Sequence, residues 1–160
     1  ILWINLVSDG LPALALGTEP AEPDVMNRPP RPRAETNFAG GLKSRIMLRG
    51  LAIGGLILAV QESLSQGNAL EYAQTVAFAT LVFAQLWHIF DSRTVTTIYD
   101  RNPFENPTLL GAVGLSAALS LGAIYTGAGR HVVLGTAPLA ASDLVACIAN
   151  AALPTLRSLG

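Results

Sequence analysis

Charged residues are scarce in this sequence. They make up 13% of its 160 residues, about half of the roughly 25% that a typical soluble domain carries. Hydrophobic residues reach 51%, and the mean hydropathy is +0.44. This composition predicts a protein whose main solvent is lipid. The net charge of −1 gives no information about partners, because the distribution of charges matters more than their sum.

The residues needed for several kinds of chemistry are also missing. Cys147 is the only cysteine, so the chain has no Cys-x-x-Cys pair and cannot form an internal disulfide. A glycine-rich phosphate loop and a Ser/His/Asp arrangement are absent as well. Only 10 residues are Lys or Arg, and membrane topology accounts for nearly all of them, so nucleic-acid binding has no support.

What the sequence does contain is a series of apolar segments. They cover residues 1–17, 42–60, 72–90, 107–126 and 139–156, with polar, Pro-rich or Gly-rich stretches between them. A helix needs about 20 mostly apolar residues to cross a bilayer, and in lipid its backbone must satisfy its own hydrogen bonds. We therefore predict an all-α fold, a multi-pass bundle of five transmembrane helices, with loops 18–41 and 91–106 on one side.

The positive charges indicate which side is cytoplasmic. If the segments cross in alternation, nine basic residues lie on the side of loops 18–41 and 91–106 and the C-terminal tail, and only Arg130 lies opposite. The nine are Arg28, Arg31, Arg33, Lys43, Arg45, Arg49, Arg93, Arg101 and Arg157. An excess of Lys and Arg marks the cytoplasmic side. We therefore expect a multi-pass protein of the cell membrane, with its N-terminal end extracytoplasmic and its C-terminus cytoplasmic.

The first apolar segment carries polar residues where a plain membrane anchor has none. Asn5, Ser8 and Asp9 stand at positions i, i+3 and i+4, which predicts that they share one face of an α-helix. Pro12 cannot donate a hydrogen bond to the carbonyl of Ser8, and Gly10 permits the backbone to unwind. The sequence therefore predicts a helix unwound between Asp9 and Pro12, with free carbonyls beside a carboxylate near the middle of the bilayer.

Such an arrangement is typical of an ion site in a transporter. A membrane carboxylate costs roughly 2.5–3.5 kcal/mol on an insertion scale, so a pure packing role for Asp9, capped by Asn5 and Ser8, is the weaker interpretation. Oxygen ligands without Cys or His suit hard cations such as calcium, magnesium or manganese. Gln85, in the third segment, either adds a neutral oxygen to this site or bonds to a neighbouring backbone or hydroxyl group. These donors are too few for a complete shell, so we expect helices outside this sequence to supply the rest.

The stretch "LWINLVSDGLPALALGTEPAEPDVMNRPPR" closely resembles the sixth membrane helix of calcium-transporting P-type ATPases and the cytoplasmic loop after it. The specific features are Asn-x-x-Ser-Asp-Gly-Leu-Pro, followed by Glu-Pro and Arg-Pro-Pro-Arg. The later segments resemble the family's last four helices in number, order and spacing, with "LGTAPL" at an outer turn. The resemblance covers essentially the whole chain, and it implies the C-terminal membrane region, helices six to ten, of an ATP-driven pump that exports calcium.

The resemblance also implies roles for individual residues. Asn5, Ser8 and Asp9 match positions that contribute to the family's ion site, with Ser8 in place of the commoner Thr. Gln85 matches a position that is Glu in two-calcium pumps of the sarcoplasmic-reticulum type and Gln in plasma-membrane-type pumps. One transported ion per cycle is therefore our hypothesis.

Other parts of the family's machinery are expected outside this sequence. In the family, the loop after the sixth helix touches the phosphorylation domain, and Glu22 and Asp24 fall at its acidic positions, so we expect them to couple ATP hydrolysis to ion binding. The sequence contains no Asp-Lys-Thr-Gly phosphorylation motif, so it holds no catalytic residue and is not expected to hydrolyse ATP alone. ATP and magnesium are expected only in a full-length pump. The expected partners are the pump's first five helices, its cytoplasmic domains and the lipid bilayer.

Two alternatives stay open at this point. The chain could be a non-enzymatic five-helix membrane subunit, or a relic, that binds partner helices. It could also belong to a pump for manganese, sodium or another cation. The Asp-Gly-Leu-Pro sequence resembles calcium pumps more than sodium pumps, whereas manganese prefers oxygen ligands similar to those of calcium.

Overall fold

The structure is a computed structural model that describes residues 2–21, 25–27, 29–30, 32, 41–65, 67, 70–91, 93, 103–126 and 135–153. Within these ranges every regular element is helical, and the predicted all-α fold with five helices is confirmed. The α-helices are α1 (Leu11–Leu16), α2 (Leu42–Ser65), α3 (Leu70–Asp91), α4 (Pro107–Tyr125) and α5 (Ala141–Ala151). A π-helix, η1 (Ile4–Gly10), runs directly into α1, and short 3₁₀ turns form η2 (Val25–Asn27) and η3 (Pro103–Glu105).

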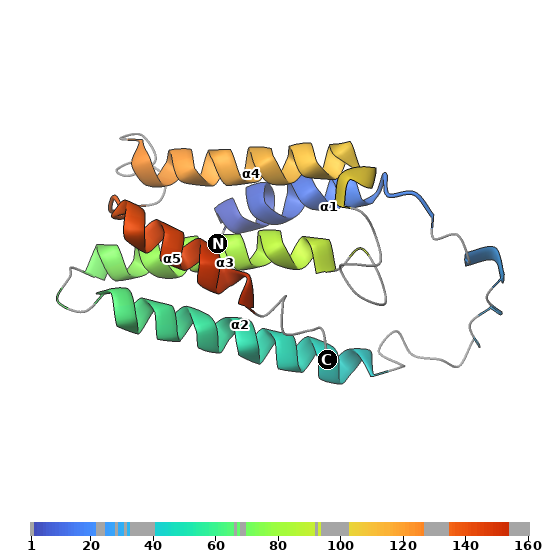
Figure 1. Cartoon of the computed structure of the whole chain (residues 1–160), viewed down its shortest axis with the longest axis horizontal. Helices are drawn as coiled ribbons and strands as arrows, with labels where there is room; N and C mark the ends of the chain where they lie inside the picture. Colours follow the sequence, from blue (N-terminus) through green and yellow to red (C-terminus); the bar gives the residue numbers. More distant parts are fainter. Residues whose placement is uncertain are drawn as a thin grey trace.

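Helix α3 lies at the centre of the bundle, where it contacts α2, α4, α5 and η1. The helices run side by side along the long axis of the molecule, and successive helices point in opposite directions (Figure 1). The π-helix η1 and α1 together lie along α4. Together they are shorter than α4. The first turn of η1 begins near the middle of the bundle's length (Figure 1). The polar residues of η1 therefore lie far from either end of the bundle.

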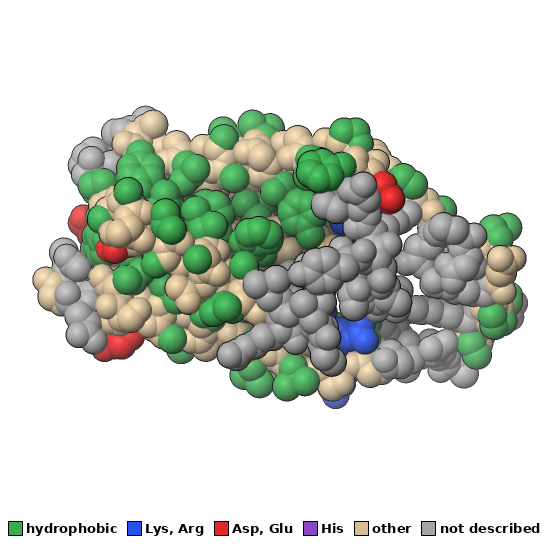
Figure 2. All heavy atoms as spheres, in the orientation of Figure 1, with side chains coloured by type: hydrophobic (Ala, Val, Ile, Leu, Met, Phe, Trp, Pro, Cys, Tyr) green, Lys and Arg blue, Asp and Glu red, His purple; other side chains and the backbone are tan. Residues whose placement is uncertain are grey.

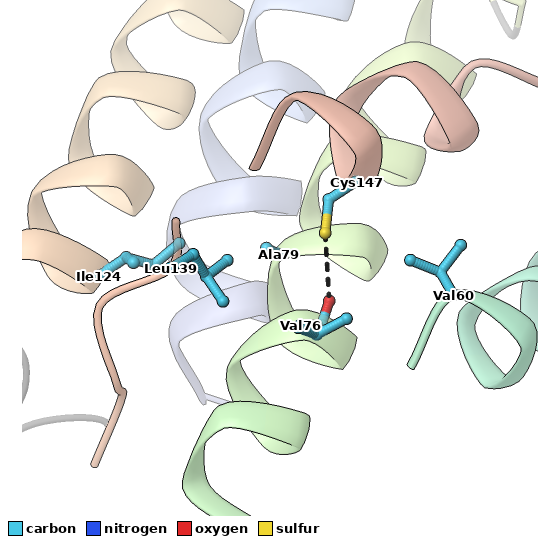
Figure 3. Packing of buried hydrophobic residues seen from close by; sticks show 6 residues of the cluster. All are labelled: Val60, Val76, Ala79, Ile124, Leu139 and Cys147. Atoms are coloured by element: carbon cyan, nitrogen blue, oxygen red, sulfur yellow. Dashed lines mark hydrogen bonds between the residues drawn. The ribbon is translucent and has the colours of Figure 1, made fainter. Parts of the chain in front are cut away.

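Two hydrophobic clusters hold α3 in place. The first joins four elements through the buried side chains of Val60, Val76, Ala79, Ile124, Leu139 and Cys147 (Figure 3). In this cluster the Cys147 thiol points at the carbonyl of Val76, 4.0 Å away. The second cluster lies further along α3 and consists of Val82, Phe83, Ala84, Leu86 and Ala151. Because α3 is buried on several sides, its rotation is fixed, and so is the direction in which Gln85 projects.

The surface has the character of a membrane protein. Helices α2, α3 and α4 are long and apolar enough to cross a membrane, whereas the apolar helices Ile4–Leu16 and Ala141–Ala151 are shorter. On α2, Leu48, Leu51 and Leu58 are each more than two-thirds exposed, which water would penalise and lipid would not. Figure 2 shows hydrophobic and small side chains over the middle of one face, with the described charged side chains towards its two ends.

The first helix departs from the α-helix in a different way from the one predicted. Backbone dihedrals are helical at Gly10 (φ −65°, ψ −49°) and Leu11 (φ −63°, ψ −49°), so the chain is not unwound between Asp9 and Pro12. The irregularity is the preceding π-helix, whose hydrogen bonds span five residues instead of four. A Cβ atom at Gly10 would lie 3.3 Å from the carbonyl oxygen of Asn5. Glycine therefore allows this close approach, and the wider turn accommodates the proline without breaking the helix.

Candidate functional site

The three polar residues of η1 do not share one environment. Ser8 is fully buried, whereas Asn5 and Asp9 are exposed on this chain. A π-helix turns less per residue than an α-helix, because each hydrogen bond encloses one residue more. Residues four apart therefore stay close to one face, while a residue three apart rotates further away. The predicted single face is thus corrected: Asn5 and Asp9 lie together, and Ser8 points into the bundle.

The face that carries Asn5 and Asp9 is otherwise apolar. Leu2, Leu6 and Leu14 lie on the exposed side of the same segment, with 85%, 75% and 76% of their surface accessible. Hydrocarbon is an unfavourable neighbour for a carboxylate, and this segment lies near the middle of the bundle's length (Figure 1). We therefore expect this face to contact a polar protein surface or a cation in preference to lipid.

Two buried oxygens in this region have no partner. Among the described residues, the side-chain polar atoms that are buried without a hydrogen bond are Ser8 Oγ and Gln85 Oε1. Ser8 belongs to η1 and Gln85 to α3, and these two elements contact each other. Leaving such an atom unsatisfied costs about 1–3 kcal/mol. The Gln85 oxygen makes no hydrogen bond to a neighbouring backbone or hydroxyl group in this structure.

The donor set fits a hard cation but does not complete a site. The four predicted ligands offer two amide oxygens, one hydroxyl and one carboxylate, which are the ligand types that calcium and similar ions prefer. Calcium takes about 6–8 oxygens. In the part of the chain that the structure describes, no group of three or more His, Cys, Asp and Glu residues could hold a metal ion. Further ligands must come from elsewhere if an ion binds here.

Two buried serines of α4 form hydrogen bonds with η1 and with the residue before it. The Ser116 hydroxyl donates to the backbone carbonyl of Val7 at 2.7 Å, and the bond is buried. One turn further along α4, Ser120 Oγ accepts a longer bond of 3.4 Å from the indole nitrogen of Trp3. These bonds tie the π-helical segment to a long helix that is itself packed in the bundle, so the position of η1 is set by α4.

A polar cluster that the sequence did not reveal lies where α1 ends and α4 begins. Arg93 Nε and Nη2 donate to Oε1 of Glu19 at 3.0 and 2.6 Å, and the Arg93 side chain is only 2% exposed. Asn106 Nδ2 donates to the second oxygen of Glu19 at 2.6 Å and to the carbonyl of Ala15 at 3.3 Å. One carboxylate thus joins three segments that are distant in sequence.

Asn106 has a second role in this cluster, because its Oδ1 accepts a hydrogen bond of 2.9 Å from the backbone N–H of Leu109. It is the N-cap of α4, and Pro107 occupies the first helical position. Asn followed by Pro is a typical helix start, so this cap could have been predicted. The Glu19–Arg93 pair spans 74 residues and leaves no local pattern. Glu22 and Asp24, predicted for the coupling loop, lie outside the described residues.

The family model described as "Cation transporting ATPase, C-terminus" matches residues 1–158. The chain belongs to this family. The resemblance noted from the segment containing Asp9 is therefore confirmed over the whole sequence. The polar segment η1 and the α4 helix that holds it both lie inside the matched region.

Several curated members of the family are similar to this chain. A calcium-transporting ATPase of Bacillus subtilis is 43% identical over 162 residues, covering 100% of this chain and 18% of the relative. A calcium-transporting ATPase of Listeria monocytogenes is 40% identical over 120 residues, 74% of this chain and 14% of the relative. The mouse calcium-transporting ATPase type 2C member 2 is 32% identical over 148 residues, 91% of this chain and 16% of the relative. The chain thus spans less than a fifth of the length of these relatives.

Proposed function

We propose that this chain acts as the C-terminal membrane part of an ATP-driven pump that exports calcium from the cytoplasm. Asn5, Ser8, Asp9 and Gln85 supply part of its intramembrane ion site. The names of the relatives support calcium as the transported substrate. Because all of them are ATPases, the alternative of a non-enzymatic membrane subunit is not favoured.

The observation that carries the proposal is the pair of unpartnered buried oxygens, Ser8 Oγ and Gln85 Oε1. Buried polar atoms in proteins are nearly always hydrogen-bonded. Hydroxyl and amide oxygens of this kind are ligands that a calcium ion binds readily. Asp9, on the neighbouring face of η1, would supply the negative charge that balances part of the ion's charge.

The different environments of these residues indicate where the ion would bind. Ser8 points into the bundle, while Asn5 and Asp9 face away from it. An ion that contacts both sets lies at the edge of η1, between this chain and the rest of the pump. The remaining ligands then come from helices of the same pump outside this sequence. ATP and magnesium act in its cytoplasmic domains, and Glu22 and Asp24 couple them to the site.

The proposal is tested by calcium-dependent ATP hydrolysis of the intact protein. Asp9→Asn removes one charge and keeps the size of the side chain, and we expect near-complete loss of activation by calcium. Asp143→Asn is the matched control: the same chemical change falls at the start of α5, where Asp143 accepts a hydrogen bond from Tyr72. Calcium activation that survives in Asp9→Asn would refute the proposed site.

The identity of the ion is tested in the same assay. The proposal predicts half-maximal activation at lower concentrations of calcium than of manganese, sodium or potassium. Stronger activation by manganese would keep the oxygen site but change its substrate, since manganese uses similar ligands.

A further inference from the structure

The backbone carbonyl that Pro12 leaves without a donor depends on the type of helix. In an α-helix the residue at position 12 donates to the carbonyl of residue 8, and in a π-helix it donates to the carbonyl of residue 7. Proline has no N–H group and cannot donate in either case. Pro12 lies in the first turn of α1, directly after the π-helix. Because η1 is π-helical, the N–H of Leu11 reaches the carbonyl of Leu6 and not that of Val7. Pro12 has no N–H to replace it, so the carbonyl of Val7 needs another donor.

The structure supplies a replacement donor at this carbonyl. The hydroxyl of Ser116 in α4 donates to Val7 O at 2.7 Å, within the usual range for such bonds. Ser116 is 0% exposed and Val7 is 9% exposed, so water is not available as a substitute. The hydroxyl therefore favours the π-helical spacing, in which the carbonyl of Val7 needs a donor, over the α-helical spacing, in which that of Ser8 would need one.

We infer that Ser116 is a positioning residue for the ion site: by hydrogen-bonding the Val7 carbonyl, it holds η1 in the π-helical form that turns Ser8 inward and leaves Asn5 and Asp9 together on the other face. This inference rests on the proposed function. Ser116 acts through the backbone of η1 and does not itself bind the ion.

Ser120 provides a matched comparison on the same helix. It lies one turn after Ser116, is equally buried at 1%, and also bonds to the η1 region. Its bond to the Trp3 side chain is 3.4 Å long, and no backbone carbonyl depends on it. Replacing either serine by alanine removes the same atom, but only the change at Ser116 should alter the form of η1.

The experiment measures the half-saturating calcium concentration and the maximal rate of calcium-dependent ATP hydrolysis in the intact protein. Ser116→Ala should raise the half-saturating concentration about tenfold. The Val7 carbonyl would lose its donor, which raises the free energy of the π-helical form of η1 that binds the ion. Ser120→Ala should change it by less than about twofold, because its bond is long. Ser116→Thr retains the hydroxyl and should restore the wild-type value. A purely structural role would lower the thermal midpoint while leaving the half-saturating concentration unchanged, and that result would overturn the inference.

A second comparison uses Pro12→Ala, which returns an N–H donor to position 12. With π-helical spacing this N–H can reach the carbonyl of Val7 and replace the hydroxyl of Ser116. In this background the proposal predicts that adding Ser116→Ala no longer changes the half-saturating concentration. The comparison remains informative if Ser116→Ala alone does not fold. A shift as large as in the wild-type background would overturn the inference.

Wild-type protein and Asp9→Asn are measured alongside these variants. If calcium activates the wild type and not Asp9→Asn, while Ser116→Ala matches the wild type, the inference fails and the proposed function stands. A wild type without any calcium activation would overturn both.

Discussion

Asp9 is the only acidic residue among the four proposed ligands, and Gln85 contributes a neutral amide. A carboxylate at Gln85 would have lowered the cost of holding a second divalent cation nearby. With a single negative charge from this chain, one ion is easier to accommodate than two. The unpartnered oxygen of Gln85 further indicates that its side chain is oriented by packing around α3 and not by hydrogen bonding of that oxygen.

The first prediction concerns Gln85. Gln85→Ala should raise the half-saturating calcium concentration of the intact pump about tenfold, since a buried ligand oxygen is lost. Gln74→Ala is the control, because Gln74 lies on the same helix α3 but is exposed. Calcium uptake and ATP hydrolysis measured together in sealed vesicles should give one calcium per ATP. A ratio of two would contradict the single-ion hypothesis.

At the scale of elements, α1 and α4 are joined along their lengths. Ser116 bonds the carbonyl of Val7 in the preceding π-helix, and Asn106 bonds the carbonyl of Ala15 at the other end of the pair. Glu19 extends the joint to the segment that follows α3 through its buried ion pair with Arg93. The helix that carries the proposed ligands is therefore fixed to α4, so motions that open or close the site are expected in elements outside this pair.

The second prediction separates the two roles of Asn106. Asn106→Ser keeps a good helix cap but loses the amide donor to Glu19, and should lower the free energy of unfolding by about 1–3 kcal/mol. Asn106→Asp also keeps the cap but places a second carboxylate beside Glu19, so it should be less stable than Asn106→Ser. Thermal unfolding of the detergent-solubilised protein measures the difference. Equal stability of all three proteins would show that the bond between Asn106 and Glu19 contributes nothing.

At the scale of the whole molecule, the described Lys and Arg residues lie at one end of the bundle. Lys43, Arg45 and Arg49 lie in the first turns of α2, at the end of the bundle where α1 ends. Glu62 and Glu71 lie at the opposite end, in the last turns of α2 and the first turn of α3. Figure 2 shows the hydrophobic middle that separates the two ends. By the positive-inside rule, the end with Lys43 is expected to be cytoplasmic.

The third prediction tests this orientation. In a Cys147→Ala background, single cysteines replace Met26, which is 90% exposed, or Glu71, which is exposed at the start of α3. A membrane-impermeant maleimide should label the cysteine at position 71 in intact cells and the one at position 26 only after the cytoplasmic side is opened. The Cys147→Ala protein without an added cysteine controls for background labelling. The reverse pattern of labelling would contradict the proposed topology.

Much of the architecture could be predicted because lipid imposes strong local constraints. The apolar segment predicted from residue 107 coincides with α4, which begins at Pro107. A proline directly after a capping residue is a local signal for a helix start and does not depend on tertiary contacts. The prediction for η1 was right about an irregular helix near Asp9 but wrong about its form. Gly10 and Pro12 indicate only that the regular hydrogen-bond pattern fails, and two different backbones are compatible with that failure.

The sequence by itself determined the helical fold, the apolar surface and the presence of a carboxylate inside an apolar segment. Each of these depends only on residues close together in the sequence and on the solvent. Only the tertiary structure decided that η1 is π-helical, that Ser8 turns away from Asp9, and that Glu19 pairs with Arg93. These features depend on α4 and on the segment after α3, which lie far along the chain and act through buried hydrogen bonds. Such bonds form between groups that packing brings together, and no local pattern of residues encodes them.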